Sequence, residues 1–317
     1  MAASGGEAHQ PRPDFFIVGA FKSGTTALYE YLRQHPQVFM PFHKEPLFFG
    51  DDLTRRYGRM TLVEYLALFR DARPGQRIGE ASTWYLYSTS AAREIAAFAP
   101  AAQIVVMLRN PVDVMYAQHS QLLFRAEEDL ADFGEALAAE PARLRGERLP
   151  PGPVRPENLY YRQSVRFAGQ LQRYFDVYGR DRVHVILFDD LLADPAAVYR
   201  ATLQFLGVDE TFQPSFEVHN PNKRVRFRRL QQAVFRPPGP MLGFVRRLRR
   251  FPLAHRARAR LLALNSRPAG RRAMDADLRH RLLAELEPEF VQLEALLGRD
   301  LAGWRERAEA DTLTAGR

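Results

Sequence analysis

The chain has 317 residues and is 46% hydrophobic, so it is long enough to bury a large core in one α/β domain or two small ones. It contains no cysteine, which excludes disulfides, thiolate metal sites and cysteine nucleophiles, and argues against zinc. The formal net charge of +8 suits an anionic ligand.

The N-terminal segment is polar and rich in alanine, glycine and proline, without the apolar core of a secretion signal. No later stretch reaches the roughly 18 apolar residues that a membrane-spanning helix needs. We therefore expect a cytoplasmic protein without a membrane span. We expect a disordered N-terminus at residues 1–13, one folded domain at 14–304 and a tail at 305–317.

The first expected elements surround a loop that is almost a nucleotide-triphosphate P-loop. Four apolar residues lead into Gly19, as in a buried parallel strand, and the residues after Thr26 have helical spacing. Gly19 and Gly24 have the separation of G-x-x-x-x-G-K-[ST], but Thr25 occupies the lysine position and Lys22 lies inside the loop. Amides at a helix N-terminus attract anions, so the pattern predicts a strand, a phosphate-binding loop and a helix.

Strands and helices continue to alternate along the chain. Strands are expected at 38–40, 77–80, 103–108 and 183–188, and helices at 62–69, 90–98, from 112 onward, and at 160–178, 195–206 and 278–297. Residues 133–158 are expected to form a surface excursion, because the proline-rich stretch at 149–153 cannot continue a helix. The alternation predicts an α/β fold, a single domain with a central parallel β-sheet flanked by helices.

The excess positive charge is concentrated between Lys223 and Arg272. Such a region can bind nucleic acid, anionic lipid or an acidic substrate. Arginine-rich helix faces are usually just exposed, however, and no helix-turn-helix, zinc-finger or RNA-recognition signature accompanies this one. We therefore expect no nucleic-acid partner.

Several separated motifs resemble those of sulfotransferases that use 3′-phosphoadenylyl sulfate (PAPS), in the carbohydrate and bacterial branch of that family. Residues 21–26 resemble its 5′-phosphosulfate loop, 106–113 its 3′-phosphate motif, 44–49 its Lys-Glu-Pro-His-Phe-Phe loop, 205–208 its Phe-Leu-Gly segment and 296–304 its C-terminal ending. The resemblance covers about residues 14–304 and implies a sulfotransferase domain with a P-loop NTPase-like fold. It implies sulfuryl transfer from PAPS to a hydroxyl, less readily an amine, of a small metabolite or saccharide.

In this reading the loop after the first strand binds the donor. Sulfuryl transfer resembles phosphoryl transfer, because charge builds up on the oxygen that bridges to the leaving phosphate. Lys22 is positioned to stabilise that charge, while Ser23, Gly24, Thr25 and Thr26 hold the 5′-phosphate. No γ-phosphate needs a metal clamp, so we expect transfer without a divalent metal.

A second set of residues is expected to bind the donor's 3′-phosphate. Arg109 ends an apolar strand, where a guanidinium can grip a phosphate through two hydrogen bonds. The family usually has a serine eight residues later, where this chain has Ala117, and whether nearby Ser120 substitutes is left open. A basic loop that resembles the one closing over the 3′-phosphate supplies three further candidates, Lys223, Arg224 and Arg226.

The acceptor must lose a proton during attack, so a general base is needed. Glu45 is the candidate, with His43 in reserve. The resemblance places the acceptor cleft after the strand at 77–80, and Trp84 there suits either stacking on a substrate ring or the core. The acceptor-binding candidates are Phe48, Trp84, Tyr85 and Tyr160.

Two other classes of function stay open. A P-loop kinase acting on a small molecule would use the same glycine loop and a Walker-B-like strand at 183–189, but it explains neither Thr25 nor the strand ending in Arg109. A basic, nucleotide-responsive binding module without catalysis rests on the arginine-rich region alone. Neither the acceptor nor the oligomeric state follows from the sequence.

Overall fold

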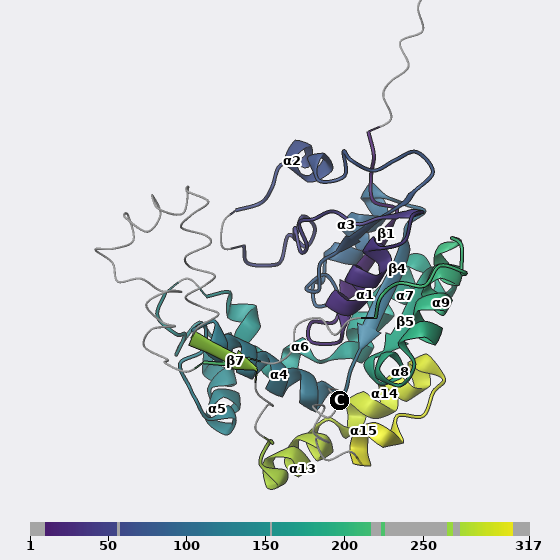
Figure 1. Ribbon diagram of the computed structural model, residues 1–317. Helices are drawn as coiled ribbons and strands as arrows, with labels where there is room; N and C mark the ends of the chain where they lie inside the picture. The colour runs from purple at the N-terminus through teal and green to yellow at the C-terminus, as the bar shows by residue number, and fades with distance from the viewer. Residues whose placement is uncertain are drawn as a thin grey trace, which may run out of the picture. The chain divides into compact units, whose positions relative to one another are not determined.

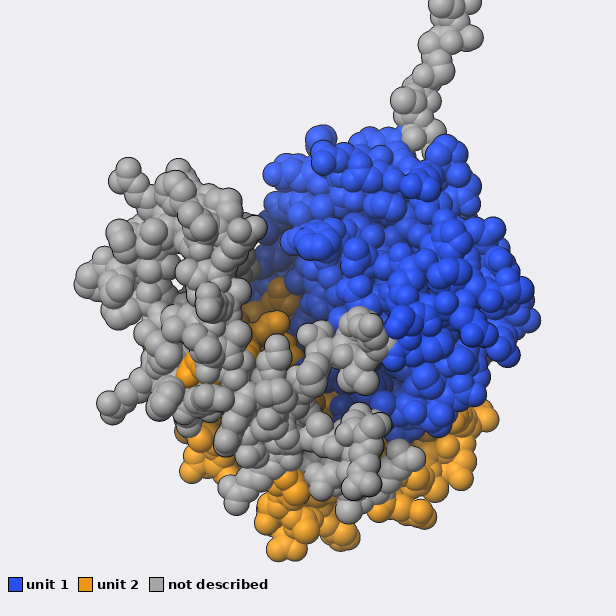
Figure 2. Space-filling view, in the orientation of Figure 1, with its two compact units in different colours: residues 1–109, 167–219 blue, residues 110–166, 220–317 orange. Residues whose placement is uncertain are grey.

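The computed structural model describes residues 10–55, 58–152, 154–216, 223–225, 265–268 and 273–306. Its contacts divide the chain into two compact units, coloured separately in Figure 2. Unit 1 comprises residues 1–109 and 167–219, and unit 2 comprises residues 110–166 and 220–317. The single folded domain at 14–304 stays a prediction.

Unit 1 alternates strands and helices around one sheet (Figure 1). Its elements are β1 (Phe15–Gly19), α1 (Thr25–Arg33), β2 (Val38–Phe39), α2 (Leu62–Ala67), β3 (Arg77–Ala81), α3 (Ala91–Phe98), β4 (Gln103–Leu108), α7 (Phe167–Tyr178), the 3₁₀ turn η2 (Arg180–Arg182), β5 (Val183–Leu187), α8 (Phe188–Ala193) and α9 (Pro195–Leu206).

The five strands form a sheet in the order β2-β3-β1-β4-β5, and every pairing is parallel. Phe15 of the central strand β1 lies opposite Gly79 of β3 on one side and Gln103 of β4 on the other. Parallel sheets carry helices on both faces, which explains why the strands read as continuous apolar runs. The predicted parallel sheet flanked by helices is confirmed.

The core of unit 1 follows the alternation of side chains along β1. Phe15 and Ile17 pack into one hydrophobic cluster with residues of α1 and α9. Phe16 points to the opposite face, where its ring meets the edge of Phe49 with centroids 5.9 Å apart. Helices α7, α8 and α9 lie beside β5 (Figure 1). Strand β3, which pairs with β1, needs a glycine opposite Phe15, because a Cβ on Gly79 would lie 2.2 Å from a ring carbon of Phe15.

Unit 2 is mainly helical. Its elements are α4 (Pro111–Phe124), α5 (Phe133–Leu144), the 3₁₀ turn η1 (Pro156–Leu159), α6 (Tyr161–Ser164), β6 (Lys223–Val225), β7 (Ser266–Pro268), α13 (Ala276–Glu285), α14 (Glu287–Leu297) and α15 (Ala302–Glu306). Strands β6 and β7 form an antiparallel pair that the sequence did not indicate.

The surface excursion expected at 133–158 is wrong for its first half, which forms helix α5. Asp132 caps the helix by accepting a hydrogen bond from the Glu135 N–H, 2.9 Å away. Pro141 lies inside the helix and has no N–H to donate to the carbonyl of Leu137. Arg162 replaces that donor, with Nη1 2.9 Å from the Leu137 oxygen. A tertiary contact therefore lets the helix continue through a proline.

A buried ion pair holds the interior of unit 2 together. Arg143 Nη1 and Nη2 each lie 2.7 Å from a carboxylate oxygen of Glu128, and both side chains are fully buried. Tyr161 Oη donates a third hydrogen bond to Glu128 at 2.7 Å. Burial by itself would raise the pKa of Glu128, but the hydrogen bonds from Arg143 and Tyr161 lower it to about 2.

Two helices expected to be continuous are interrupted. The helix predicted at 160–178 consists of α6 and α7, and the one at 278–297 consists of α13 and α14. The second break falls at Leu286, just before Pro288, which occupies the first turn of α14. Proline is tolerated in a first turn, where its N–H would have no helical partner, but not in a helix interior. Within the described residues, none of the helices has the length and apolar character required to span a membrane.

Candidate active site

The strand order of unit 1 creates a binding edge at the carboxyl ends of β1 and β4. The chain leaves β1 toward β2 and β3 on one side and then returns to β4 on the other side. Ligands of open α/β sheets bind at the point where the connections diverge in this way. The turn after β1, the segment after β3 and Arg109 after β4 all lie at this edge.

The turn after β1 is built to approach an anion closely. Gly24 caps α1 in the left-handed conformation, with φ 88°. A Cβ at this position would lie 2.8 Å from a ring carbon of Phe188, so both the conformation and the space require glycine. Among the described residues, nothing accepts a hydrogen bond from the backbone N–H groups of Ser23, Gly24, Thr25 and Thr26. These donors at a helix N-terminus suit a phosphate.

The structure brings together Lys22 and Arg109, which are 87 residues apart in sequence. Arg109 Nη1 donates to the main-chain oxygen of Lys22 over 3.4 Å. The guanidinium also lies over the ring of Phe188, 4.8 Å from its centroid. The guanidinium of Arg109, which follows β4, therefore contacts the backbone of the turn that carries Lys22.

The segment after β3 runs beside this turn. The N–H of Ser82 donates to Ile17 O over 3.1 Å, and the N–H of Leu86 donates to Val18 O over 2.8 Å. Trp84, between them, stacks on Phe21 of the turn, with centroids 4.8 Å apart and an interplanar angle of 12°. The turn and the expected acceptor segment are thus packed directly against each other.

The loop at 44–49 carries the predicted general base. The N–H of Glu45 donates to Ala81 O at the end of β3, 2.9 Å away. Its carboxylate pairs with Lys44, with Nζ and Oε1 3.0 Å apart, and the Glu45 side chain is 39% exposed. Glu45 can therefore be reached by an acceptor. His43 is exposed and forms no hydrogen bond with any described residue.

The aromatic acceptor candidates in unit 1 are largely buried. Phe48 stacks on Tyr65 with centroids 4.2 Å apart, and Trp84 and Tyr85 are also buried. The Tyr85 hydroxyl accepts a hydrogen bond from the N–H of Phe49 at 3.2 Å. The acceptor-binding roles of these residues stay predictions, and the structure assigns them packing contacts.

Glu80 in β3 was missed as a site residue. Its side chain is completely buried, and its Oε2 accepts hydrogen bonds from Tyr65 Oη at 2.9 Å and Tyr85 Oη at 3.0 Å. Its Oε1 is buried and has no hydrogen-bond partner in the described part of the chain. Burial raises the pKa of Glu80 to about 7. The available sequence signal was a carboxylate at the end of a strand, beside Gly79.

The remaining predicted residues belong to unit 2. Ser120 on α4 donates through Oγ to the carbonyl of Tyr116 on its own helix, 2.9 Å away. The hydroxyl of Tyr160 is 3.4 Å from the carbonyl oxygen of Arg143. Lys223 and Arg224 lie in β6, of which the backbone is described, and Arg226 lies outside the described residues. Their roles stay predictions.

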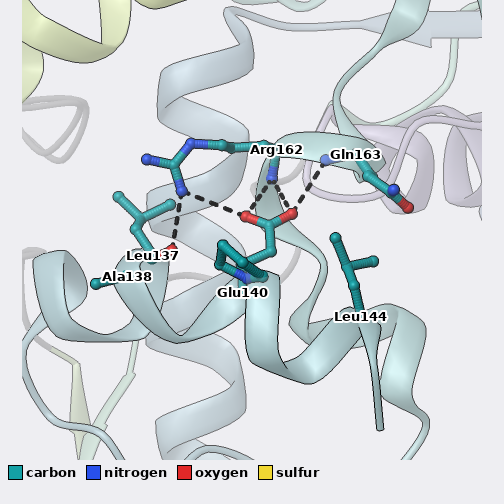
Figure 3. Close-up of a pocket in the computed structure, with 7 residues that line it drawn as sticks. Leu137, Ala138, Glu140, Leu144, Arg162 and Gln163 are labelled. Carbon is teal, nitrogen blue, oxygen red and sulfur yellow. Dashed lines mark hydrogen bonds and ion pairs between the residues drawn. The ribbon is translucent and has the colours of Figure 1, made fainter. Parts of the chain in front are cut away.

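Unit 2 also contains a hollow of about 360 Å³ beside α5 and α6 (Figure 3). Glu140 in its wall accepts hydrogen bonds from the N–H groups of Arg162 and Gln163, at 2.9 and 3.3 Å. The lining residues are Leu137, Ala138, Glu140, Pro141, Leu144, Arg162 and Gln163. None of them is a predicted site residue.

Comparison with known proteins gives concordant matches. The family model described as "Sulfotransferase domain" matches residues 12–232. Human heparan sulfate glucosamine 3-O-sulfotransferase 6 is 28% identical over 208 residues, covering 66% of this chain and 56% of the relative. A bifunctional heparan sulfate N-deacetylase/N-sulfotransferase 1 from Caenorhabditis briggsae is 26% identical over 226 residues, covering 65% of this chain and 24% of the relative.

The chain therefore spans between a quarter and just over half of the length of these curated relatives. A solved structure matches over a larger share. The crystal structure of a sulfotransferase from Alicyclobacillus acidocaldarius has a TM-score of 0.70 and 32% sequence identity, and the match covers 93% of this chain and 99% of that one. A sulfotransferase fold, of the P-loop NTPase-like kind, follows from this likeness.

Proposed function

Because the chain belongs to the sulfotransferase domain family, we propose that it transfers a sulfuryl group from PAPS to a hydroxyl of a saccharide or small metabolite, or less readily to an amine. The observation that carries the proposal is the contact of Arg109 with the backbone of Lys22, on a turn whose N–H groups at residues 23–26 donate to no described residue. A kinase is not favoured, since the matched family transfers sulfuryl groups.

The turn after β1 fits the phosphate of such a donor. Gly24 leaves room for close approach, and the N–H groups of the turn lie at the positive end of the α1 dipole. When bound, PAPS supplies an activated sulfuryl group on its 5′-phosphate. Lys22 and the N–H groups of residues 23–26 would hold that end, and Arg109 would bind the 3′-phosphate.

The protein's own contribution is to place charge and accept a proton. The ammonium group of Lys22 would stabilise negative charge on the bridging oxygen as the bond to sulfur breaks. The carboxylate of Glu45 would take the proton from the acceptor hydroxyl as that oxygen attacks. Lys44 pairs with this carboxylate at 3.0 Å and fixes its orientation before the acceptor arrives.

We propose a saccharide as the preferred acceptor class. The support comes from the names of the two relatives above, both of which specify heparan sulfate. The exposed carboxylate of Glu45 can be reached by a hydroxyl on a large acceptor as well as on a small one. The names of these relatives therefore favour a saccharide acceptor.

The test is incubation of the purified protein with sulfur-labelled PAPS and a panel of hydroxylated and N-unsubstituted saccharides and small metabolites, with EDTA present. Label transfer to an acceptor is expected in the wild type and in Arg93→Ala, which removes an exposed cation from α3. Lys22→Ala should lower kcat by about 10²- to 10³-fold, as for loss of one charge-stabilising group. Equal rates in the two variants would remove Lys22 from the mechanism.

A ligand-binding assay separates the alternatives independently of the acceptor. Thermal stabilisation by 3′,5′-adenosine bisphosphate without Mg²⁺ is expected for a sulfotransferase. Stabilisation by ATP with Mg²⁺ alone would support the kinase and contradict the proposal. A lack of response to either nucleotide would contradict both and favour a binding module.

A further inference from the structure

The loop at 44–49 is held through its backbone by the segment that follows Glu80. Three alternate N–H groups of the loop donate to three acceptors in that segment. The bonds run from Glu45 N to Ala81 O at 2.9 Å, from Leu47 N to Ser82 Oγ at 3.1 Å and from Phe49 N to Tyr85 Oη at 3.2 Å.

The carbonyl groups of the same loop are held by Arg55. Its guanidinium donates to the main-chain oxygens of residues 47, 49 and 50 at 3.0, 2.8 and 2.8 Å.

This loop needs external support, because its own conformation is unfavourable. Glu45 and Leu47 have φ values of 62° and 52°, in the left-handed region that non-glycine residues seldom adopt. Such conformations persist only where the surrounding structure imposes them, and they cluster at functional sites. The orientation of the Glu45 side chain therefore depends on the acceptors that hold the loop.

The acceptor for Phe49 is itself oriented by Glu80. A tyrosine hydroxyl has one proton to donate and lone pairs with which to accept. Tyr85 donates that proton to Glu80 Oε2 at 3.0 Å, so its lone pairs are directed toward the N–H of Phe49. Without the carboxylate, the hydroxyl proton would be free to turn toward the loop and repel that N–H.

We propose that Glu80 is a positioning residue for the loop at 44–49, acting through the Tyr85 hydroxyl and thereby holding Glu45 in its reactive orientation. This inference rests on the proposed function only for the role of Glu45. The Glu80 side chain is completely buried, so it is not proposed to contact PAPS or the sulfuryl acceptor. Tyr65 provides a matched comparison, because its hydroxyl donates to the same oxygen of Glu80 at 2.9 Å but forms no hydrogen bond with the loop.

The kinetic test compares Tyr85→Phe with Tyr65→Phe. Each variant deletes one hydroxyl from the same buried cluster and keeps the ring. Tyr85→Phe should lower kcat at least about tenfold with an unchanged KM for PAPS, because a small displacement of a reacting group is costly. Tyr65→Phe should stay within about twofold of the wild type in both constants. Equal kcat in the two variants would overturn the inference.

Hydrogen exchange supplies a readout that does not require activity. In Tyr85→Phe and Glu80→Leu, the amides of residues 47–49 should exchange at least about tenfold faster than in the wild type. Glu80→Gln keeps an oxygen that can accept from Tyr85, so the amides of residues 47–49 should exchange at the wild-type rate in this variant. The same is expected in Tyr65→Phe. Wild-type exchange in Tyr85→Phe would refute the positioning role, even if Glu80→Leu did not fold.

The two hypotheses can therefore fail separately. A wild-type protein that transfers no label from PAPS would refute the proposed function, and the exchange rates would still decide whether Glu80 positions the loop. An active wild type whose Tyr85→Phe variant matched Tyr65→Phe in kcat and exchange would refute only the positioning role.

Discussion

Replacing the buried Glu80 by glutamine should change how the stability of the protein depends on pH. Burial raises the pKa of Glu80 from 4.5 to about 7. The ionisable groups that face it are the hydroxyls of Tyr65, Tyr85 and Tyr174 and the carboxylate of Glu45, whose negative charge adds to the rise. The folded protein therefore binds the Glu80 proton more tightly than the unfolded chain does.

The sign and size of the effect follow from that difference. Below pH 4.5 the carboxyl is protonated in both states, and its contribution to stability is fully present. Between pH 4.5 and about 7 the unfolded chain releases the proton while the fold retains it, so stability is lost as pH rises. Each pKa unit corresponds to about 1.4 kcal/mol, which makes the total loss about 3 kcal/mol. For a chain of 317 residues this corresponds to a fall in Tm of about 5 °C.

The assay is thermal and urea unfolding of the wild type, Glu80→Gln and Glu210→Gln from pH 4 to pH 8. Glu80→Gln cannot titrate at this position, so its unfolding free energy relative to wild type should rise by about 3 kcal/mol across the interval. Glu210→Gln, at an exposed glutamate, should run parallel to the wild type. If the difference in unfolding free energy between Glu80→Gln and the wild type did not change with pH, Glu80 would titrate alike in the folded and unfolded states, which would contradict the raised pKa.

Three further substitutions test the site and the fold. Glu45→Gln should lower kcat by about 10²-fold or more without weakening the binding of 3′,5′-adenosine bisphosphate. Glu30→Gln also removes a carboxylate from an ion pair and should leave both kcat and nucleotide binding unchanged. Reduced nucleotide binding in Glu45→Gln would contradict the role of a base. Gly24→Ala should weaken nucleotide binding, measured by calorimetry, by about tenfold or more, because its Cβ would lie 2.8 Å from a ring carbon of Phe188. Gly75 has φ 84° and lies in open space, so Gly75→Ala should lower only the free energy of unfolding. Arg143→Met leaves a buried carboxylate unpaired and should lower the free energy of urea unfolding by about 3 to 5 kcal/mol, so a cost below about 1 kcal/mol would show that the ion pair contributes little.

Local sequence patterns predicted the fold well where the signal lies within one element. The apolar run before Gly19 and the run at 103–108 are strands of the parallel sheet, as expected. These predictions are confirmed because a strand buried on both faces must be apolar throughout, whatever its neighbours are. Helix α5 was missed because the proline-rich stretch at 149–153 led us to expect a surface excursion over the whole of 133–158. The helix also contains Pro141, and the donor that compensates for it comes from Arg162, 25 residues away from the Leu137 carbonyl.

The sequence by itself determined the chemistry of the donor turn. Glycine spacing, a lysine inside the loop and a following helix are local features, and together they specify a phosphate-binding turn without reference to the rest of the chain. Only the tertiary structure decided that Arg109 meets the Lys22 backbone and that buried Glu80 is linked through the Tyr85 hydroxyl to the loop of Glu45. Both depend on which strands become neighbours, and a residue's desolvation and hydrogen-bond partners are set by that packing.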